Sequence, residues 1–253
     1  MRLVVLTGLA AAFVTGCSGS GGSSSASESS AGSGSGSSSS GAVPSPSASP
    51  KLEDASADEI LAQSRSALLA ARSVHAKGAV QNSGTTYSLD LRMVRGVGAA
   101  GSVASAGRTL GVLRIGKVAY VRPDAASWRA ATGSDAAARS FAGKYLKVTA
   151  ASGSSFTPFL TLTDVQQTYG EALSPSGTVT KGPVTTLRGR RVIDLKIDGG
   201  NSGDVFVAVD GTPYPLRLAY GSGASQRVDF DGFGAKIALT APPASKVVAV
   251  PAR

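Results

Sequence analysis

The amino-acid sequence predicts an α+β domain in which helices pack against one face of an antiparallel β-sheet. About ten short segments alternate apolar and polar residues or consist of strand-forming residues. Most of these segments follow one another through tight turns, as strands in hairpins do. About three further segments space their apolar residues as a helix does. Strands in meander order with so few helices favour hairpins over the crossover units of a parallel sheet.

The domain is predicted to begin with a helix. Ser56-Ala57-Asp58-Glu59 has the pattern of a capping box, in which the first and last residues satisfy each other's backbone amides. Apolar residues then recur at helical spacing, at Ile60, Leu61, Ala67, Leu68 and Ala71. One face of this helix should therefore be buried.

A run of predicted strands follows the helix. Residues 74–81 and 87–94 flank the turn residues Asn82-Ser83-Gly84. The second of these strands alternates, so that one side is apolar and the other meets water. Further strands are predicted at residues 98–104, 108–115 and 118–122, with Gly116-Lys117 as the last turn.

The middle of the domain departs from this strand pattern. Residues 135–142 have the composition of a short helix, residues 145–148 of a brief strand, and residues 158–173 of a longer helix. The tail from Pro242 onward is expected to end at an edge. A second set of strands is predicted at residues 178–181, 191–197, 204–209, 215–220 and 227–230.

Residues 1–16 are predicted to be an export signal. Arg2 provides a positive start, and Leu3 to Val14 form an apolar run that is short for a membrane span. The next residues, Val14-Thr15-Gly16-Cys17, resemble the lipobox of bacterial lipoproteins, in which the cysteine receives diacylglycerol and the signal is cut before it. An ordinary signal peptide followed by an unmodified cysteine is the alternative. Because Cys17 is the one cysteine of the 253 residues, neither an internal disulfide nor a cysteine-based site is expected.

Residues 17–50 are predicted to be a tether, and residues 51–253 the folded domain. The segment is rich in Ser, Gly, Ala and finally Pro, with almost nothing to bury. As a flexible coil, about 33 residues reach roughly 30 Å. The domain is therefore expected close to the outer face of the cytoplasmic membrane.

Charge and composition indicate the class of partner. The chain carries a net charge of +9, which favours anionic partners such as lipid headgroups. Nucleic acid is not expected as a partner, because the cations are spread along the strands and the chain is predicted to be exported. Aromatic residues make up 6% of the chain, so the interior is filled by small side chains and an internal cavity is plausible.

Three patterns that suggest catalysis or a cofactor have plainer explanations. Residues 96–101 match the letters of a dinucleotide fingerprint but lack a following helix and acidic residue, so we expect a Gly-rich strand or bulge. His75 is the one histidine and lacks a nucleophile motif, so its expected role is structural. Paired carboxylates for hydrolysis remain possible, although strands or turns are expected to expose the candidates Asp194, Asp204, Asp229 and Asp231. No catalytic residue, metal or cofactor is predicted.

The chain resembles the LppX/LprG-type lipoproteins of actinobacteria, whose fold is similar to that of the LolA/LolB lipoprotein carriers. The resemblance rests on the lipobox and tether and on residues 71–75, 116–121 with Trp128, 144–148, 207–217, 228–234 and 241–243. It implies a strongly curved sheet, a half-barrel, with about three helices over its concave face and an apolar cavity between them. Members of the family bind acylated lipids or glycolipids in that cavity, and the family has no catalytic motif to transfer.

The cavity would be lined by the inward side of the strands. An acyl chain needs an apolar and roomy surface, since each buried methylene gains about 0.8 kcal/mol. For each candidate, ordinary core packing is the alternative. The candidates are Tyr87, Leu89, Leu91, Met93, Val112, Val118, Tyr120, Leu216, Leu218, Val228 and Phe230.

A cluster of arginines could meet the headgroup of such a lipid. Arg188, Arg190 and Arg191 form the densest positive segment, and the alternative is a solvated turn. The sequence thus predicts a membrane-anchored, non-enzymatic lipoprotein that binds or transfers acylated lipids or glycolipids. An envelope module that binds a protein partner or senses a signal, without lipid cargo, is the alternative, and a cell-wall hydrolase is a third.

Overall fold

A computed structural model describes residues 51–82, 84–149, 161, 163–164, 166–175, 177–199, 202–221 and 226–249. The predicted export signal, Cys17 and the tether lie outside the described residues, as do residues 158–160, 162 and 165 of the helix predicted at residues 158–173. In the described part of that segment, Gln166–Gly170 forms a short π-helix, η4. No helix of the described residues is both long and apolar enough to cross a bilayer.

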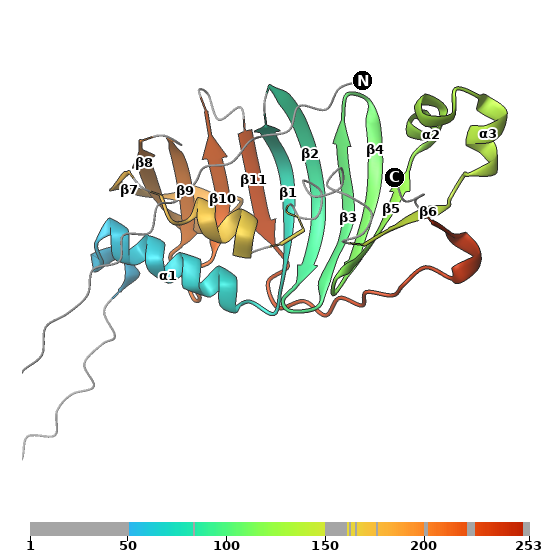
Figure 1. The fold of residues 1–253 in the computed structure, drawn as a ribbon. Coiled ribbons are helices and arrows are strands. Elements are labelled where there is room, and N and C mark those ends of the chain that lie inside the picture. The colour runs from blue at the N-terminus through green and yellow to red at the C-terminus, as the bar shows by residue number, and fades with distance from the viewer. Residues whose placement is uncertain are drawn as a thin grey trace, which may run out of the picture. The chain divides into compact units, whose positions relative to one another are not determined.

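The strands form one curved, unclosed sheet in the order β12-β6-β5-β4-β3-β2-β1-β11-β10-β9-β8-β7 (Figure 1). All pairs are antiparallel except β12 with β6. The predicted fold class is confirmed, with twelve strands instead of about ten. The strands are β1 (Ser73–Asn82), β2 (Thr85–Val94), β3 (Gly98–Ser105), β4 (Arg108–Ile115), β5 (Val118–Pro123), β6 (Tyr145–Val148), β7 (Thr178–Leu187), β8 (Arg190–Asp198), β9 (Gly203–Ala208), β10 (Pro215–Tyr220), β11 (Gln226–Asp231) and β12 (Val247–Ala249).

The opening helix, α1 (Ala57–Ala70), begins at the predicted capping box. The Ser56 amide donates to the Glu59 carboxylate at 2.9 Å, and the Glu59 amide donates to the Ser56 hydroxyl at 3.3 Å. The helix contacts β7, β9 and β10, so it crosses one half of the sheet (Figure 1). The face of the sheet that α1 contacts is called the inner face below, and the opposite face the outer face.

The main core lies between α1 and the inner face. Ile60 and Leu68 of α1 pack in one cluster with Leu91 of β2 and Phe230 of β11, and each of these four is at most 2% exposed. Strand register explains why these residues meet, because Leu91 pairs with Ala76 and Ala76 pairs with Phe230 across β2, β1 and β11. One side of three adjacent strands is thus apolar, as the predicted alternation of β2 requires.

Strand β3 is built from small residues, and its neighbours approach it closely. A side chain at Gly98 or Gly101 would place Cβ 1.9 Å from the Arg114 carbonyl oxygen or 2.0 Å from the Asp90 carbonyl oxygen. The segment with dinucleotide-like letters therefore forms a turn and a strand, as the sequence predicts. On the inner face it contributes Ala99 and Val103, which fill little of the space under the sheet.

Two further helices follow β5. Helix α2 (Ala125–Thr132) is capped by Asp124, whose carboxylate accepts from the Ser127 amide at 2.7 Å. Helix α3 (Asp135–Ser140) was predicted, whereas α2 was not. The two helices contact each other, and the Trp128 ring of α2 stacks on Phe141 at 4.8 Å between ring centres. The described residues also include the 3-10 turns η1 (Leu52–Asp54) and η6 (Ala244–Lys246).

The tail after β11 returns to the sheet edge, as predicted. It ends in β12, whose Val247 pairs with Tyr145 of β6 in parallel register. The outer face has a small apolar cluster of its own on β8, β9 and β10, where Val192, Ala208 and Leu216 are buried together.

Candidate functional site

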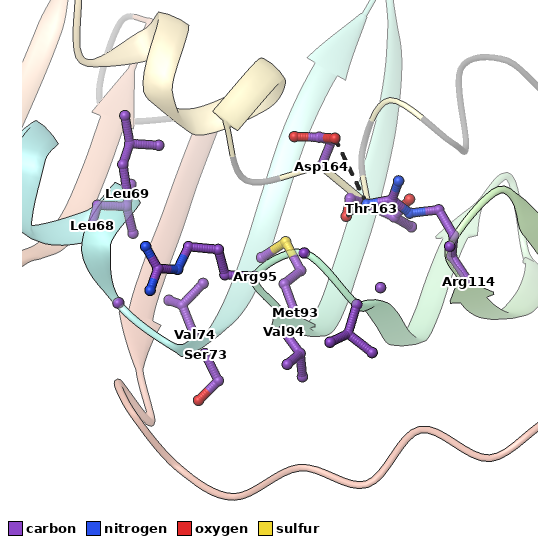
Figure 2. Close-up of a pocket in the computed structure, with 15 residues that line it drawn as sticks. Leu68, Leu69, Ser73, Val74, Met93, Val94, Arg95, Arg114, Thr163 and Asp164 are labelled. Atoms are coloured by element: carbon purple, nitrogen blue, oxygen red, sulfur yellow. Dashed lines mark hydrogen bonds and ion pairs between the residues drawn. The ribbon is translucent and has the colours of Figure 1, made fainter.

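A pocket of about 310 Å³ lies between the end of α1 and the inner face of the sheet (Figure 2). We call it the inner pocket. Strands β1 to β4 contribute to it, together with the turns that join them and the segment at residues 163–164. Its lining consists of Leu68, Leu69, Ala71, Ser73, Val74, Met93, Val94, Arg95, Gly96, Val97, Gly98, Arg114, Gly116, Thr163 and Asp164.

The floor of the inner pocket is apolar. Leu68 of α1, Val74 of β1 and Met93 of β2 are each at most 2% exposed and belong to the main core cluster. The junction between α1 and β1 is fixed by Ser73, whose hydroxyl donates to the Ala235 carbonyl at 2.7 Å. The floor is therefore a rigid hydrocarbon surface, because its residues also carry the packing of helix on sheet.

Arg114 brings a cation to the inner face. It lies in β4 at an inward position, two residues after Val112, and its side chain is one quarter exposed. Its Nη2 donates to the Thr163 carbonyl at 3.0 Å and lies 3.7 Å from the Asp164 carboxylate (Figure 2). Its buried Nε has no hydrogen-bond partner among the described residues. An unpaired guanidinium donor in a pocket with an apolar floor favours an anionic or polar ligand group, since burying a donor without a hydrogen-bond partner is costly.

Arg95 supplies a second cation at the rim. It lies in the turn between β2 and β3, where its amide donates to the Arg72 carbonyl at 3.0 Å, and its side chain is exposed. Figure 2 shows Arg95 and Arg114 on two sides of Met93. The inner pocket thus combines an apolar floor with a basic rim, which suits an amphiphile with an acyl chain and an anionic head.

Other chemistry has less support among the described residues. No three His, Cys, Asp or Glu side chains in the described part of the chain are grouped so that they could hold a metal ion. Burial raises the pKa of Tyr169, whose ring packs edge-on against Phe230 at 5.1 Å between ring centres. That phenol is therefore neutral and acts as core.

The eleven predicted cavity residues separate between the two faces. Only Met93 lines the inner pocket. The structure places Val118, Tyr120 and Leu216 on the outer face: Tyr120 pairs with Leu113 and not with an inward residue, and Leu216 joins the outer apolar cluster. The other inner-face candidates are Tyr87, Leu89, Leu91, Val112, Leu218, Val228 and Phe230.

The predicted arginine cluster lies at the turn between β7 and β8, away from the inner pocket. Arg188 lies 2.5 Å from the Asp229 carboxylate, and Arg191 forms ion pairs with Glu53 and Asp210. Arg190 is exposed. The cations of the inner pocket, Arg95 and Arg114, were not predicted. Arg114 had a signal, because it is a charged residue on the apolar side of an alternating strand.

The outer face carries a polar network instead. His75 lies between two carboxylates, with Nε2 2.9 Å from Asp90 and Nδ1 2.8 Å from Asp231, in agreement with a structural role. The predicted exposure of Asp229 is wrong, since this residue is 6% exposed. Its strand neighbours and Arg188 cover the carboxylate. A hollow of about 730 Å³, the outer groove, extends over this network, with Ala79, Ser88 and Ala104 among its lining residues.

Comparison with known proteins identifies the fold. No family model matches the chain, and no curated protein is similar to it in sequence. The crystal structure of LprF from Mycobacterium bovis matches with a TM-score of 0.52 and 16% identity, over 74% of this chain and 96% of that chain. The domain has the LprF fold. The fold implied by the resemblance to LppX/LprG-type lipoproteins is thereby confirmed.

Two further structures match less closely. The Mycobacterium tuberculosis lipoprotein LppX has 13% identity and a TM-score of 0.45, over 72% of this chain and 97% of that chain. An uncharacterized conserved protein from Thermus thermophilus has 10% identity and a TM-score of 0.36, over 76% of this chain and 98% of that chain.

Proposed function

We propose that this protein is a lipoprotein that binds the acyl chain of a lipid or glycolipid in its inner pocket. Cys17 carries the lipid anchor, residues 18–50 form the tether, and the domain stands at the outer face of the cytoplasmic membrane. The observation that carries the proposal is the union of an apolar floor at Leu68, Val74 and Met93 with an unpaired guanidinium donor in one pocket. The fold shared with LprF supports it.

The size of the pocket sets what it holds. Its volume of about 310 Å³ is at the lower end of the range for ligand pockets, roughly 300–1,000 Å³. One acyl segment fits there, and the rest of a larger lipid lies outside. Burial of about ten methylenes gains about 8 kcal/mol, which is similar to micromolar affinity before the cost of ordering the chain. Because no energy source drives transfer, the direction in which lipid moves would depend on its concentration gradient or on a partner protein.

Filling the inner pocket tests the proposal. Ala71→Leu adds bulk at a lining position, whereas Ala104→Leu adds the same bulk in the outer groove. With the full chain and a fluorescent fatty acid as the probe, Ala71→Leu should raise the Kd at least about tenfold, since about 1.4 kcal/mol corresponds to that factor. Ala104→Leu should leave the Kd within twofold. Equal affinity of both variants and the parent would contradict the assignment of the pocket.

The alternative function is an envelope module that binds a protein partner without lipid cargo. The observation that favours it is the outer groove, where ion pairs of Asp90 and Asp229 hold a polar surface in place. This function predicts a different result for the two variants. Ala104→Leu would then reduce capture of an envelope partner, and neither variant would change fatty-acid binding.

A further inference from the structure

Three junctions between elements and the segment after β11 meet at the ends of strands on one side of the sheet. The Arg95 amide donates to the Arg72 carbonyl at 3.0 Å, and the Gly116 amide donates to the Val97 carbonyl at 2.8 Å. The Gly234 amide donates to the Ser73 carbonyl at 3.0 Å. These bonds tie the junctions α1–β1, β2–β3 and β4–β5 into one continuous surface. Because Ser73, Arg95, Val97 and Gly116 also line the inner pocket, the pocket reaches the surface here.

This surface is basic. We call it the mouth edge and define it by the exposed residues Arg72, Arg95, Val97, Lys117 and Lys236. Its four cations form no ion pair with any residue that the structure describes. The nearby acids are engaged elsewhere, since Asp164 lies 3.7 Å from Arg114 and Asp231 lies 2.8 Å from His75. The free charge of the mouth edge is therefore positive.

The opposite edge of the sheet differs. At the turn between β3 and β4 and at the ends of β5 and β8, the described residues include the cation Arg108 and also the acids Asp124 and Asp198. Charges of both signs are therefore present there, with two acids beside one cation. The mouth edge thus carries unpaired positive charge among the described residues, and the inner pocket opens at it.

An apolar side chain projects from the middle of the mouth edge. Val97 is 47% exposed, and it is one of two large apolar residues that are this exposed in the described part of the chain. Gly96 before it has φ 73°, a turn conformation that other residues rarely adopt. Segments that bind at a membrane interface combine apolar residues with cations in this way.

We propose that the mouth edge docks on the surface of an anionic bilayer. Val97 enters the headgroup region, and Arg72, Arg95, Lys117 and Lys236 face the lipid phosphates. The inner pocket then opens toward the membrane, so that an acyl chain passes between bilayer and pocket without crossing open water. The docking proposal does not depend on the proposed function, but the passage of an acyl chain from the bilayer into the pocket does.

Vesicle binding tests the docking. The full chain with Cys17→Ser, which carries no lipid anchor, is floated with vesicles of phosphatidylcholine alone or with about 30 mol% phosphatidylglycerol. Each surface cation contributes about 1 kcal/mol toward anionic lipid, which corresponds to about fivefold in partition. Arg72→Ala with Lys117→Ala should therefore reduce partition to the anionic vesicles about 25-fold. Binding to the neutral vesicles measures the contribution of the apolar predicted export signal, residues 1–16, which is the same in all variants.

A matched control changes the same net charge elsewhere. Arg108→Ala with Arg139→Ala removes two exposed cations outside the mouth edge, and partition should stay within twofold of the parent. Val97→Ser should weaken partition and leave its salt dependence unchanged. Equal losses in the two double variants would show that net charge, and not this edge, drives binding, and would overturn the proposal.

Fatty-acid binding of the same samples separates the two proposals. Because Arg72 and Lys117 do not line the inner pocket, their double variant should bind the fluorescent fatty acid in solution with the parent's Kd. Docking that depends on the mouth-edge cations, without fatty-acid binding, would support the docking proposal and refute the proposal that the inner pocket binds acyl chains. Fatty-acid binding together with vesicle docking that does not depend on the mouth-edge cations would support the cargo proposal and refute the docking proposal.

Discussion

Arg217 Nε lies 2.6 Å from the Asp229 carboxylate, on the neighbouring strands β10 and β11. Two further guanidinium groups, of Arg188 and Arg227, lie 2.5 Å and 3.4 Å from the same carboxylate. The Asp229 side chain is 7% exposed, so the outer face contains a buried acid held by three cations. One of these cations comes from the turn between β7 and β8, which the ion pair holds against the outer face.

Removal of this carboxylate should destabilise the fold. In Asp229→Ala, the Arg217 guanidinium, which is 19% exposed, keeps its charge without a partner. Loss of one partner of a buried pair costs about 3–5 kcal/mol, and we expect about 3 kcal/mol because Arg188 and Arg227 reach water. Urea unfolding measures the change. Asp210→Ala, which breaks an exposed pair with Arg191, should cost less than about 1 kcal/mol, and equal losses would contradict the account.

The Asp90 carboxylate should make stability depend on acid pH. Burial acts to raise its pKa, but hydrogen bonds from His75 at 2.9 Å and Lys77 at 3.2 Å outweigh burial and hold the pKa below its ordinary value of 3.8. A lowered folded-state pKa gives stability that is present above pH 3.8 and lost as the pH falls through the folded value. The parent should therefore be more stable than Asp90→Asn at pH 5.

The difference should shrink as the pH falls below 3.8, because the stability that a lowered folded-state pKa provides is lost as the pH falls through the folded value. Urea unfolding of both proteins at pH 5, 4 and 3 measures this. A difference that stays constant or grows with acid would show that the ion pairs of Asp90 do not stabilise the fold.

Strand β3 should tolerate no side chain at Gly101. The Cβ of alanine would lie 2.0 Å from the Asp90 carbonyl oxygen, so β2 and β3 must separate. Gly101→Ala should lower the free energy of unfolding by more than about 1 kcal/mol. Gly111→Ala in the adjacent strand β4 is the control, since its Cβ would meet the side chain of Arg122 at 3.4 Å. Thermal unfolding that is unchanged in Gly101→Ala would contradict the close strand approach.

Arg114 should select the head of the ligand and not its chain. In Arg114→Met the pocket keeps its shape but loses a charged donor, and a hydrogen bond to a charged group is worth about 1.5–3 kcal/mol. The affinity for palmitate should fall about tenfold, while the affinity for hexadecanol should change less than twofold. Arg122→Met, which removes an arginine stacked 5.6 Å from the Tyr145 ring, is the control. Equal losses for both ligands would show a structural role for Arg114.

The strands could be predicted because their signals are local. Alternation in β2 and the glycine turns place β1 to β5 within about two residues of their observed ends, and β6 is predicted at its observed bounds. Helix α2 also had a local signal in Asp124 before Ala125 and in Gly133 at its end. Strand β12 had none, because three residues gain their strand conformation only by pairing with β6 far away in the chain.

The faces of two strands could not be predicted from alternation alone. In β5 both sides are apolar, and register with β4 turns Ala119 and Val121 inward and the larger Tyr120 outward. In β10 the register shifts between Pro215 and Arg217, so Leu216 and Leu218 lie on opposite faces although they are two residues apart. A bulge changes which side chains share a face, and its position depends on the partner strand.

The inner pocket was predicted as a class of site, but most of its residues were not. The low aromatic content of the chain indicated space beneath the sheet, and the inner pocket lies there. Its rim comes from turns whose meeting depends on strand order, so Arg95 had no signal in the sequence. The predicted Arg188 and Arg191 are instead held by Asp229 and by Glu53 with Asp210.

Native mass spectrometry with lipid extraction tests the central claim most directly. The full chain is purified in mild detergent from a bacterial membrane, and the covalent lipid that we propose at Cys17 is distinguished from cargo by its persistence after denaturation. The account predicts a noncovalent acyl lipid on the parent protein and on Ala104→Leu, and its loss from Ala71→Leu. Reproducible absence of noncovalent acyl lipid from the folded parent would contradict it.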